Sequence, residues 1–357
     1  MSKERVAVAL SGGVDSSVAV LLLKEAGCEV MGIHMRLWDS FRPDYQAHQA
    51  EHVCQIANVP FSIVDLQKEF EHYVVDYFCQ EYRRGQTPNP CIACNQHIKF
   101  GFLLSKALSL GADFLATGHY ARIEHSGDGY HLLKAADLSK DQSYFLYTLA
   151  QEKLGHLLFP LGSHTKAEVK EIAKREGLSM AFKPSQDICF ISQKNYRAFL
   201  SQRFPNVPGD IVDTQGKILG QHQGIAFYTI GQRHGLGLAS GEPLYVIRIE
   251  PDNNRVVLGE GKELHSQEVT VERLSWVAGK PPLPRWVEGG EGEGFPSEHT
   301  TIIARIRYKS EGGEATIVPK ADSADVWFAQ PQRAVTPGQA IVFYQGNEIL
   351  GGGIISN

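Results

Sequence analysis

The first 35 residues constrain the fold more than any other stretch, because they read as a strand, a loop, a helix and a second strand. Arg5 to Leu10 is an apolar strand-like run, and Glu29 to Met35 is another. Between them, apolar residues recur at helical spacing from Ser16 to Ala26 and stop at Gly27. Two strands joined by a helix in this way lie parallel in one sheet, with a right-handed crossover. The chain therefore begins as an α/β protein.

The same alternation continues through residues 1–205, which we expect to form one domain. The later elements are a helix over Asp44–Ala57, a strand over Phe61–Asp65, helices over Lys68–Tyr82 and Cys91–Leu110, a strand over Phe114–Thr117, and helices over Gln142–Leu158, Lys166–Glu176 and Asn195–Phe204. Alternating strands and helices predict a parallel sheet that helices cover on both faces.

From Pro208 the pattern changes to short β-rich runs separated by Gly, Pro and Asn turns. The expected strands are Ile225–Ile230, Leu244–Ile249, Arg255–Leu258, Thr301–Ile306, Glu314–Val318 and Ala340–Tyr344. A weak division near Leu264–Glu268 predicts two small antiparallel domains, residues 206–266 and 267–357. The segment Gly289–Gly294 alternates glycine with glutamate and reads as a solvated loop.

Composition sets limits on the compartment and on the partners. No apolar run approaches the roughly 18 residues that span a bilayer, so we expect no membrane anchor. All six cysteines lie in the first 189 of 357 residues, a distribution that favours the reducing cytoplasm over a secreted disulfide scaffold. The net charge of −5 excludes a globally basic nucleic-acid binder. A local Lys/Arg patch for a polyanion stays possible.

The loop Ser11–Ser17 directly follows a strand and directly opens a helix. Its two glycines let the backbone approach a ligand, and the helix N-terminus and three serines add donors that suit a pyrophosphate. The plain alternative is an ordinary turn in which Gly supplies the geometry and Asp or Ser caps the helix. The string is neither a Walker A loop nor a dinucleotide fingerprint. It resembles the loop of ATP pyrophosphatases, in which Asp15 would help to hold Mg²⁺.

Two cysteines stand at the start of a predicted helix. Asn89 suits the N-cap and Pro90 the first helical position, so Cys91 and Cys94 share one face of the first turn. A helix N-terminus lowers the pKa of nearby thiols, which predicts reactive cysteines. The plain alternative is two buried thiols. Cys28, Cys54 and Cys79 have apolar neighbours and read as packing residues, and Cys189 alone would read the same way.

Six motifs stand in the order and spacing of the bacterial tRNA-specific 2-thiouridylases, the MnmA/TrmU family. They are Ser11–Ser17, Thr87–Asn95, Ala116–Tyr120, Lys140–Leu146, Ser185–Phe190 and Tyr228–Arg233. The sequence therefore resembles this family over nearly its whole length. The resemblance implies an N-terminal ATP-pyrophosphatase domain of the adenine nucleotide alpha-hydrolase-like fold, a small central β domain and a C-terminal antiparallel β-barrel. Together these would grip the anticodon stem and loop of a tRNA.

The resemblance also implies roles for residues at matching positions. Cys94 corresponds to the catalytic cysteine, Cys189 to the cysteine that carries a persulfide, and Asp15 to a residue that organises ATP and Mg²⁺. The ATP-contacting positions are Ala9, Leu10, Ser11, Gly12, Gly13, Val14, Asp15, Ser16, Met35 and Gly118. The tRNA-contacting positions are Asn89, Pro90, Cys91, Lys140, Asp141, Gln142, Arg307 and Tyr308. Without the resemblance, Arg307 and Tyr308 would read as part of a solvated strand.

Cys91 departs from the family pattern, because many members have an aspartate there with a general acid/base role. Three thiols, Cys91, Cys94 and Cys189, could then converge as ligands of a four-iron four-sulfur cluster with one open iron. Zinc is a second option, with His97 at Cys-x-x-Cys-x-x-His spacing as a fourth ligand. Metal-free persulfide chemistry is the third.

The implied reaction is ATP-dependent 2-thiolation of the wobble uridine of tRNA. Uridine O2 attacks the α-phosphate, pyrophosphate leaves, and sulfur then displaces AMP. A sulfur carrier or a cysteine desulfurase must load Cys189, since no part of the chain suits the extraction of sulfur from free cysteine. Two alternatives stay open: another ATP pyrophosphatase that adenylates a small molecule, and a non-catalytic RNA-binding module.

Overall fold

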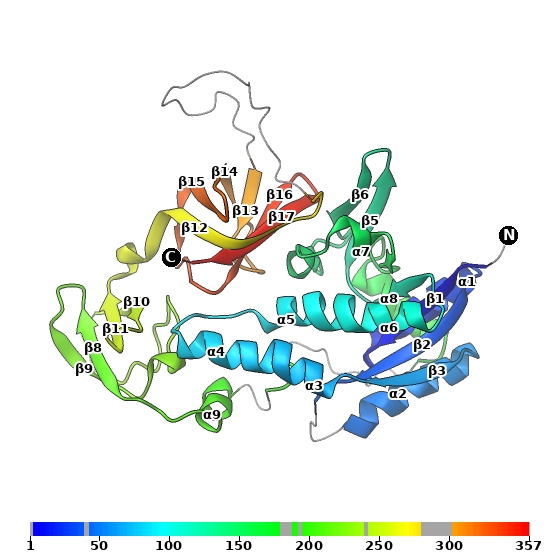
Figure 1. The fold of residues 1–357 in the computed structure, drawn as a ribbon, viewed down its shortest axis with the longest axis horizontal. Coiled ribbons are helices and arrows are strands. Elements are labelled where there is room, and N and C mark those ends of the chain that lie inside the picture. The colour runs from blue at the N-terminus through cyan, green and yellow to red at the C-terminus, as the bar shows by residue number, and fades with distance from the viewer. Residues whose placement is uncertain are drawn as a thin grey trace, which may run out of the picture.

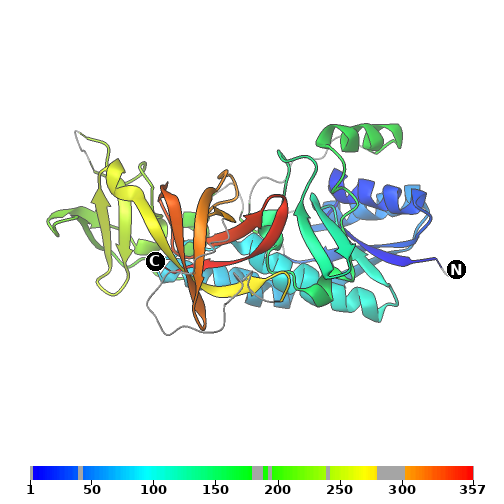
Figure 2. The ribbon, with the colours of Figure 1, turned by 90° about the horizontal axis from the view of Figure 1, so that it is seen from above.

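The computed structural model describes residues 3–38, 43–178, 188–191, 195–238, 242–279 and 302–356. Figure 1 shows an α/β part that carries the N-terminus, joined to two β-rich parts. Seen from above, the molecule is elongated, with the N-terminal sheet at one end, the central β-rich part at the other, and the C-terminal barrel between them (Figure 2). The predicted order of one α/β part and two β parts is therefore confirmed.

The N-terminal part is built on a five-stranded sheet in the order β3-β2-β1-β4-β7. All four pairings are parallel, as the alternating sequence predicts. The strands are β1 (Arg5–Leu10), β2 (Glu29–Arg36), β3 (Phe61–Asp65), β4 (Phe114–Ala116) and β7 (Leu157–Leu158). Strand β1 is buried at every position after its first, as a central strand covered on both faces must be.

Helices cover both faces of this sheet. Val8 packs in one core cluster with residues of α1, α2 and α8, and Ala9 packs in another with residues of α3 to α6, because successive side chains of a strand point to opposite faces. The helices are α1 (Val14–Glu25), α2 (Pro43–Ala57), α3 (Gln67–Phe70), the π-helical η1 (Glu71–Asp76), α4 (Tyr77–Arg83), α5 (Pro90–Ala93), the π-helical η2 (Cys94–Leu103), α6 (Leu104–Ser109), α8 (Lys166–Arg175) and α9 (Tyr196–Ser201).

The predicted helix over Gln142–Leu158 is wrong. The segment forms the 3₁₀ turn η3 (Ser143–Leu146), the short helix α7 (Gln151–Leu154) and the edge strand β7. Its apolar residues are buried by contact with the C-terminal part and not by one face of a helix. Tyr144 is fully buried, and its hydroxyl donates to Ala340 O of that part at 2.8 Å. The segment is thus packed between two domains, which helical periodicity does not foresee.

The central part is a four-stranded sheet in the order β10-β11-β8-β9. The predicted strand over Ile225–Ile230 is wrong, because Ile225–Phe227 is the 3₁₀ turn η5. The strands are β8 (Gly209–Asp213), β9 (Ile218–His222), β10 (Tyr245–Glu250) and β11 (Arg255–Gly259), and the 3₁₀ turn η6 (Gly261–Leu264) leads out of the sheet. The sheet is also not wholly antiparallel, because β8 and β11 pair in parallel.

The C-terminal part is a closed six-stranded antiparallel barrel, since β12 pairs with both β15 and β17. Its strands are β12 (His265–Trp276), β13 (Ile302–Arg305), β14 (Gly313–Pro319), β15 (Ser323–Arg333), β16 (Ala340–Gln345) and β17 (Glu348–Ile355). Closure removes the free edge along most of β17, which pairs with β12 over Gly351–Ile355. The expected loop Gly289–Gly294 lies outside the described residues.

A hairpin that the sequence pattern did not reveal ties the N-terminal part to the barrel. Strands β5 (Ala121–Ser126) and β6 (Gly129–Lys134) follow β4, and β6 pairs with β17, which extends the barrel sheet to eight strands. His131 Nδ1 lies 2.7 Å from Glu348 Oε1, and Lys134 Nζ donates to Gly346 O at 2.9 Å. The hairpin therefore fixes the barrel against the N-terminal part.

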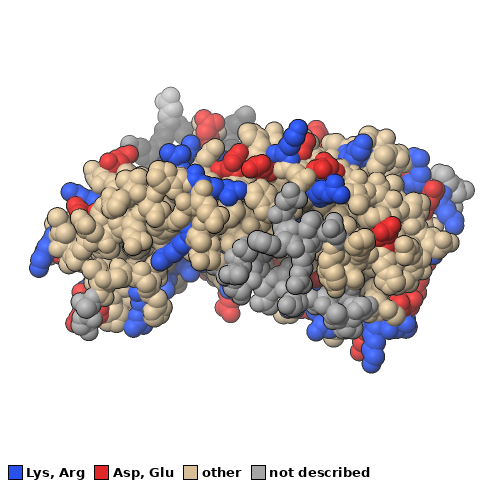
Figure 3. Space-filling model, turned by 90° about the horizontal axis from the view of Figure 1, so that it is seen from below, with Lys and Arg blue, Asp and Glu red and all other residues tan. Residues whose placement is uncertain are grey.

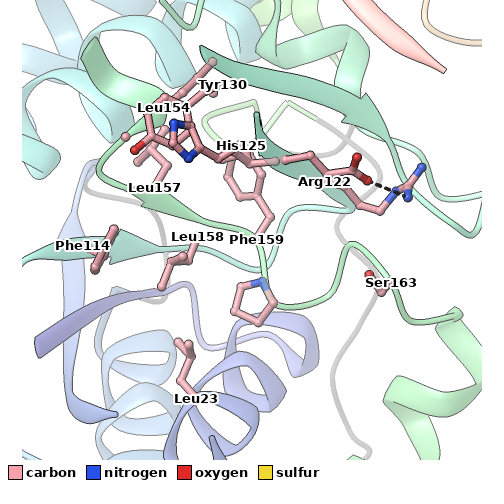
Figure 4. Close-up of a pocket in the computed structure, with 14 residues that line it drawn as sticks. Leu23, Phe114, Arg122, His125, Tyr130, Leu154, Leu157, Leu158, Phe159 and Ser163 are labelled. Atoms are coloured by element: carbon pink, nitrogen blue, oxygen red, sulfur yellow. Dashed lines mark hydrogen bonds and ion pairs between the residues drawn. The ribbon is translucent and has the colours of Figure 1, made fainter. Parts of the chain in front are cut away.

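A cavity of about 410 Å³ lies beneath this hairpin (Figure 4). Its wall is mostly apolar and includes Phe114, Leu158 and Phe159, with His125 and Tyr130 at the hairpin. Residues of the loop Ser11–Ser17 do not line it. This cavity is therefore separate from the site described next.

Candidate active site

The loop Ser11–Ser17 follows the carboxyl end of β1 and includes the first turn of α1, which begins at Val14. Gly12 has a φ of +74°, and a Cβ there would lie 2.7 Å from Gln46 O of α2, so the position requires glycine. Ser16 Oγ donates to Gly13 O at 3.0 Å and accepts from Ser11 N at 3.2 Å. These bonds fix the loop at the N-terminus of a 12-residue helix, where free amides favour an anion.

The other predicted nucleotide positions lie at the same edge of the sheet. Leu10 at the end of β1 pairs with His34 of β2, which places Met35 next to the loop side of the sheet. Gly118 follows β4, and a Cβ on it would lie 2.7 Å from Ser16 N. The structure therefore brings Ala9, Leu10, the loop, Met35 and Gly118 to one edge of the sheet. Carboxyl ends of parallel strands are where such sheets bind ligands.

Asp15 has two partners that the sequence did not reveal. The Tyr120 hydroxyl donates to Asp15 Oδ1 at 2.9 Å, and Lys166 forms an ion pair with the same oxygen. Lys166 is the first residue of α8, whose N-terminus is fixed by a reciprocal capping box between Thr165 and Glu168. The only sequence signal for Lys166 is its place just after the N-cap of a predicted helix.

The cysteine turn, defined here as Cys91–Asn95, has the predicted local structure. Asn89 Oδ1 accepts from Cys91 N at 3.2 Å, and Pro90 occupies the first position of α5. Cys91 is exposed and Cys94 is buried, with 8% of its surface accessible. All six cysteines are free thiols.

The thiols are not activated in the way the helix N-terminus suggested. Burial raises the pKa of Cys94 to about 11. The pKa of Cys91 and of Cys189 is also raised, because the surrounding chain partly desolvates these thiols although both residues keep exposed surface. The charge of Lys99 opposes the shift at all three thiols. The expectation of a lowered pKa is therefore wrong for the free protein, because desolvation outweighs the amides of a four-residue helix. The charges of Cys94 and Cys91 raise the pKa of Cys189 further, and that of Lys99 lowers it.

Lys99 connects the thiols to the loop side of the site. Its Nζ lies 3.4 Å from His119 Nε2, and His119 directly follows Gly118. Burial, together with Lys99, lowers the pKa of His119 well below its usual value, so this ring is neutral. Sequence reasoning missed Lys99, although it lies on the same helical stretch as Cys94.

The alkylation rate of Cys94 is expected to rise as the pH approaches 11, because only the thiolate reacts and its pKa is raised to about 11. Lys99→Met removes a charge that lowers this pKa, so the profile should move to higher pH. Peptide mass mapping after iodoacetamide treatment measures the rate at Cys94. The exposed Lys106→Met is the matched control. A profile that Lys99→Met leaves unchanged would contradict the role of Lys99.

The predicted metal ligands do not gather into a ligand set. Among the described residues, which include all three thiols and His97, no three His, Cys, Asp or Glu side chains lie close enough to hold a metal. The His97 ring stacks on Tyr73 with centroids 4.9 Å apart. As placed, the residues therefore do not fit a four-iron four-sulfur cluster or a zinc ion. A Mg²⁺ ion is a different case, because Asp15 and phosphate oxygens are the ligands it prefers.

The positions expected to contact tRNA have different surroundings. Lys140 and Arg307 are exposed, and Tyr308 is half-buried against Phe145. Asp141 is buried: its carboxylate accepts from Ser143 Oγ at 2.9 Å and pairs with Arg305 at 3.6 Å. Gln142 Oε1 accepts from Tyr120 N at 3.0 Å. On the face in Figure 3, the described Lys and Arg side chains are interspersed with Asp and Glu, as the net charge of the chain suggests.

These features define a nucleotide-binding α/β protein with two appended β domains. Three family models match in series: a tRNA methyl transferase HUP domain over residues 4–193, a tRNA methyl transferase PRC-barrel domain over 197–260, and an aminomethyltransferase beta-barrel domain over 266–355. Within the described residues, no helix is long and apolar enough to cross a membrane.

Curated relatives match over almost the whole chain. The tRNA-specific 2-thiouridylase MnmA of Carboxydothermus hydrogenoformans is 45% identical, with 99% of this chain and 98% of that protein covered. MnmA of Magnetococcus marinus is 44% identical, with 99% of each chain covered. The chain belongs to the tRNA-specific 2-thiouridylase MnmA family.

Solved structures match more distantly. The U34-tRNA thiolase NcsA from Methanococcus maripaludis, with its [4Fe-4S] cluster, is 22% identical, with a TM-score of 0.35 over 56% of this chain and 64% of that chain. This likeness is too weak to bear on the site.

Proposed function

We propose that this protein is an ATP-dependent tRNA-uridine 2-sulfurtransferase that thiolates the wobble uridine. The observation that carries the proposal is the position of Lys99, which lies on the same helical stretch as Cys94 and contacts His119 beside the nucleotide loop. This contact supports a single site that holds both the sulfur-bearing groups and the phosphate-binding groups. Full-length relatives named as 2-thiouridylases support the same assignment.

The first step is adenylation of the uridine. Uridine O2 attacks the α-phosphorus of ATP, and pyrophosphate leaves with the electron pair of the broken P–O bond. The amides at the N-terminus of α1 would bind phosphate oxygens, and Lys166, which pairs with Asp15 in the free protein, would donate to the leaving pyrophosphate. Mg²⁺ would be held by Asp15 and would neutralise phosphate charge. Such preorganised charge usually contributes more to the rate than any other single effect.

Sulfur transfer then replaces AMP. The terminal sulfur of a Cys189 persulfide attacks C2, the C2–O bond breaks, and AMP leaves with the former O2. The Cys94 thiolate attacks Cys189 Sγ and breaks the S–S bond. This releases 2-thiouridine and leaves a Cys94–Cys189 disulfide, which an external dithiol reduces. Lys99 favours the thiolate that this step needs.

We propose the persulfide route over a cluster because the described thiols do not gather as ligands. Protein purified without oxygen, or reconstituted with iron and sulfide, should thiolate tRNA at a rate that does not follow its iron content. Cys91→Asp should retain activity, because the carboxylate is common in the family. Absorption near about 400 nm with activity proportional to iron would instead establish the cluster held by Cys91, Cys94 and Cys189.

The RNA partner is the anticodon stem and loop of a tRNA. Asn89, Pro90 and Cys91 would lie beside the target base, and Lys140, Asp141, Gln142, Arg307 and Tyr308 would form the wider contact. Because Asp141 is buried and paired with Arg305, its contribution would be to hold its neighbours in place. Sulfur comes from a carrier or a cysteine desulfurase. The proposed setting is the cytoplasm, and the proposed domains are residues 1–205, 206–266 and 267–357.

Lys140→Ala and Arg307→Ala should each weaken tRNA binding by roughly 3- to 10-fold and lower the salt slope by about 1, because each removes a positive contact to a polyanion. Filter binding between low and moderate salt measures both quantities. Lys217→Ala, on an exposed turn of the central part, is the control. Unchanged affinity in both variants at low salt would place the RNA elsewhere.

One assay separates this function from its two rivals. Pyrophosphate release should depend on tRNA that lacks 2-thiouridine. Release without tRNA would favour an enzyme that adenylates a small molecule. Binding of tRNA without release would favour a non-catalytic RNA-binding module.

A further inference from the structure

The barrel holds the chain just before the cysteine turn. Thr87 N donates to Pro337 O at 2.9 Å, and Gln339 Nε2 donates to Thr87 O at 2.7 Å. Gly338, between these two barrel residues, has a φ of +88°, and a Cβ there would lie 2.8 Å from Thr87 N. Both the N–H and the carbonyl of Thr87 are therefore hydrogen-bonded to one turn of the barrel, Pro337–Gln339. Thr87 lies four residues before Cys91.

A second contact holds the other end of the cysteine turn. Asn95 is 3% exposed, and its Nδ2 donates to Phe145 O at 3.0 Å. Its Oδ1 is buried and has no hydrogen-bond partner among the described residues. A buried acceptor such as Asn95 Oδ1 without a hydrogen bond is unfavourable for stability, so we expect the rest of the side chain to make a favourable contact. The bond to Phe145 provides one.

Phe145 in turn contacts the barrel. Its ring lies 4.5 Å from the ring of Tyr308, centroid to centroid. The backbone of Tyr308 is held by Arg305 Nη2, which donates to Tyr308 O at 2.6 Å, and Arg305 also pairs with Asp141. Phe145 therefore connects the two sides: its ring contacts Tyr308 of the barrel, and its carbonyl accepts the hydrogen bond from Asn95.

We propose that Gln339 and Asn95 are positioning residues for Cys94, and that they couple RNA engagement by the barrel to sulfur transfer. Neither residue needs to touch the reacting atoms. Because the two bonds flank the cysteine turn, a displacement of the barrel by RNA would be transmitted to Cys94, which is buried in the free protein. The RNA part of this proposal rests on the proposed function, whereas the placement of Cys94 by the barrel does not.

The placement is tested on the full-length protein without RNA. Gln339→Ala and Asn95→Ala should each speed alkylation of Cys94 by about tenfold at a fixed pH, because each loosens the turn that shields this thiol from the reagent while the charge of Lys99 is retained. Peptide mass mapping distinguishes Cys94 from the other cysteines. Gln330→Ala, at an exposed position of β15, is the matched control. Equal alkylation rates in the wild type and the three variants would overturn the placement of Cys94 by the barrel. Two variants at separate positions are used so that a folding defect in one of them does not decide the result.

The coupling is tested with tRNA. Both variants should lower the single-turnover rate of sulfur transfer by about tenfold, leave pyrophosphate release and tRNA affinity within about twofold, and combine less than additively. Equal losses of pyrophosphate release and thiolation, or full additivity, would overturn the coupling. If the wild-type protein does not thiolate tRNA, the proposed function fails, and the alkylation result still decides the placement.

Discussion

Cys94→Ser and Cys189→Ser are each expected to lower tRNA thiolation by at least about 10³-fold, because a serine hydroxyl can neither carry a persulfide nor resolve one. ATP binding should stay nearly intact, since the nucleotide loop at α1 and the cysteine turn are separate groups of residues. Mass spectrometry of tRNA nucleosides measures 2-thiouridine, and equilibrium dialysis measures ATP binding.

The matched control is Cys28→Ser, at a half-buried thiol away from the cysteine turn. It should thiolate at nearly the wild-type rate. Retained thiouridine in either catalytic variant would remove that cysteine from the mechanism. Loss of ATP binding together with thiolation would point to damaged folding rather than to lost chemistry.

Asp15→Asn and Lys166→Met should have the opposite pattern, with adenylation lost and the thiols unaffected. Each removes a charge that organises phosphate groups, so pyrophosphate release should fall by about 10²- to 10³-fold. The Cys94 alkylation rate should not change, because neither residue influences the pKa of that thiol.

Lys170→Met is the control for Lys166, since it lies one helical turn further along α8 and is exposed. Normal pyrophosphate release in Asp15→Asn would separate the loop from catalysis. A Lys166→Met variant with normal release would mean that the ion pair with Asp15 only stabilises the free protein.

The N-terminal fold could be predicted because its strands carry their own signal. Strand β1 is a continuous apolar run, and a central parallel strand requires one. The cap at Asn89 was also predictable, because it depends on residues within one helical turn. The segment from Gln142 to Leu158 was not, since its apolar residues face a barrel whose contacting strand lies 196 residues further along the chain.

In the candidate site, too, features set by local sequence could be predicted and features set by distant contacts could not. The loop glycines and the paired cysteines are local motifs, and the structure places them as expected. Lys99 and Lys166 were missed because a lysine on a helix has no distinctive local pattern, and only the fold brings Lys166 to Asp15 across 151 residues. The thiol pKa values were misjudged for a similar reason, because burial is a property of the tertiary structure.

The most direct test of the proposed reaction follows one oxygen atom. A tRNA that lacks 2-thiouridine and carries ¹⁸O at C2 of its wobble uridine would be incubated with ATP, Mg²⁺ and a sulfur donor. If uridine O2 attacks the α-phosphorus and sulfur then displaces AMP, each thiouridine formed should yield one AMP that contains ¹⁸O. Unlabelled AMP beside thiolated tRNA would contradict adenylation of the base.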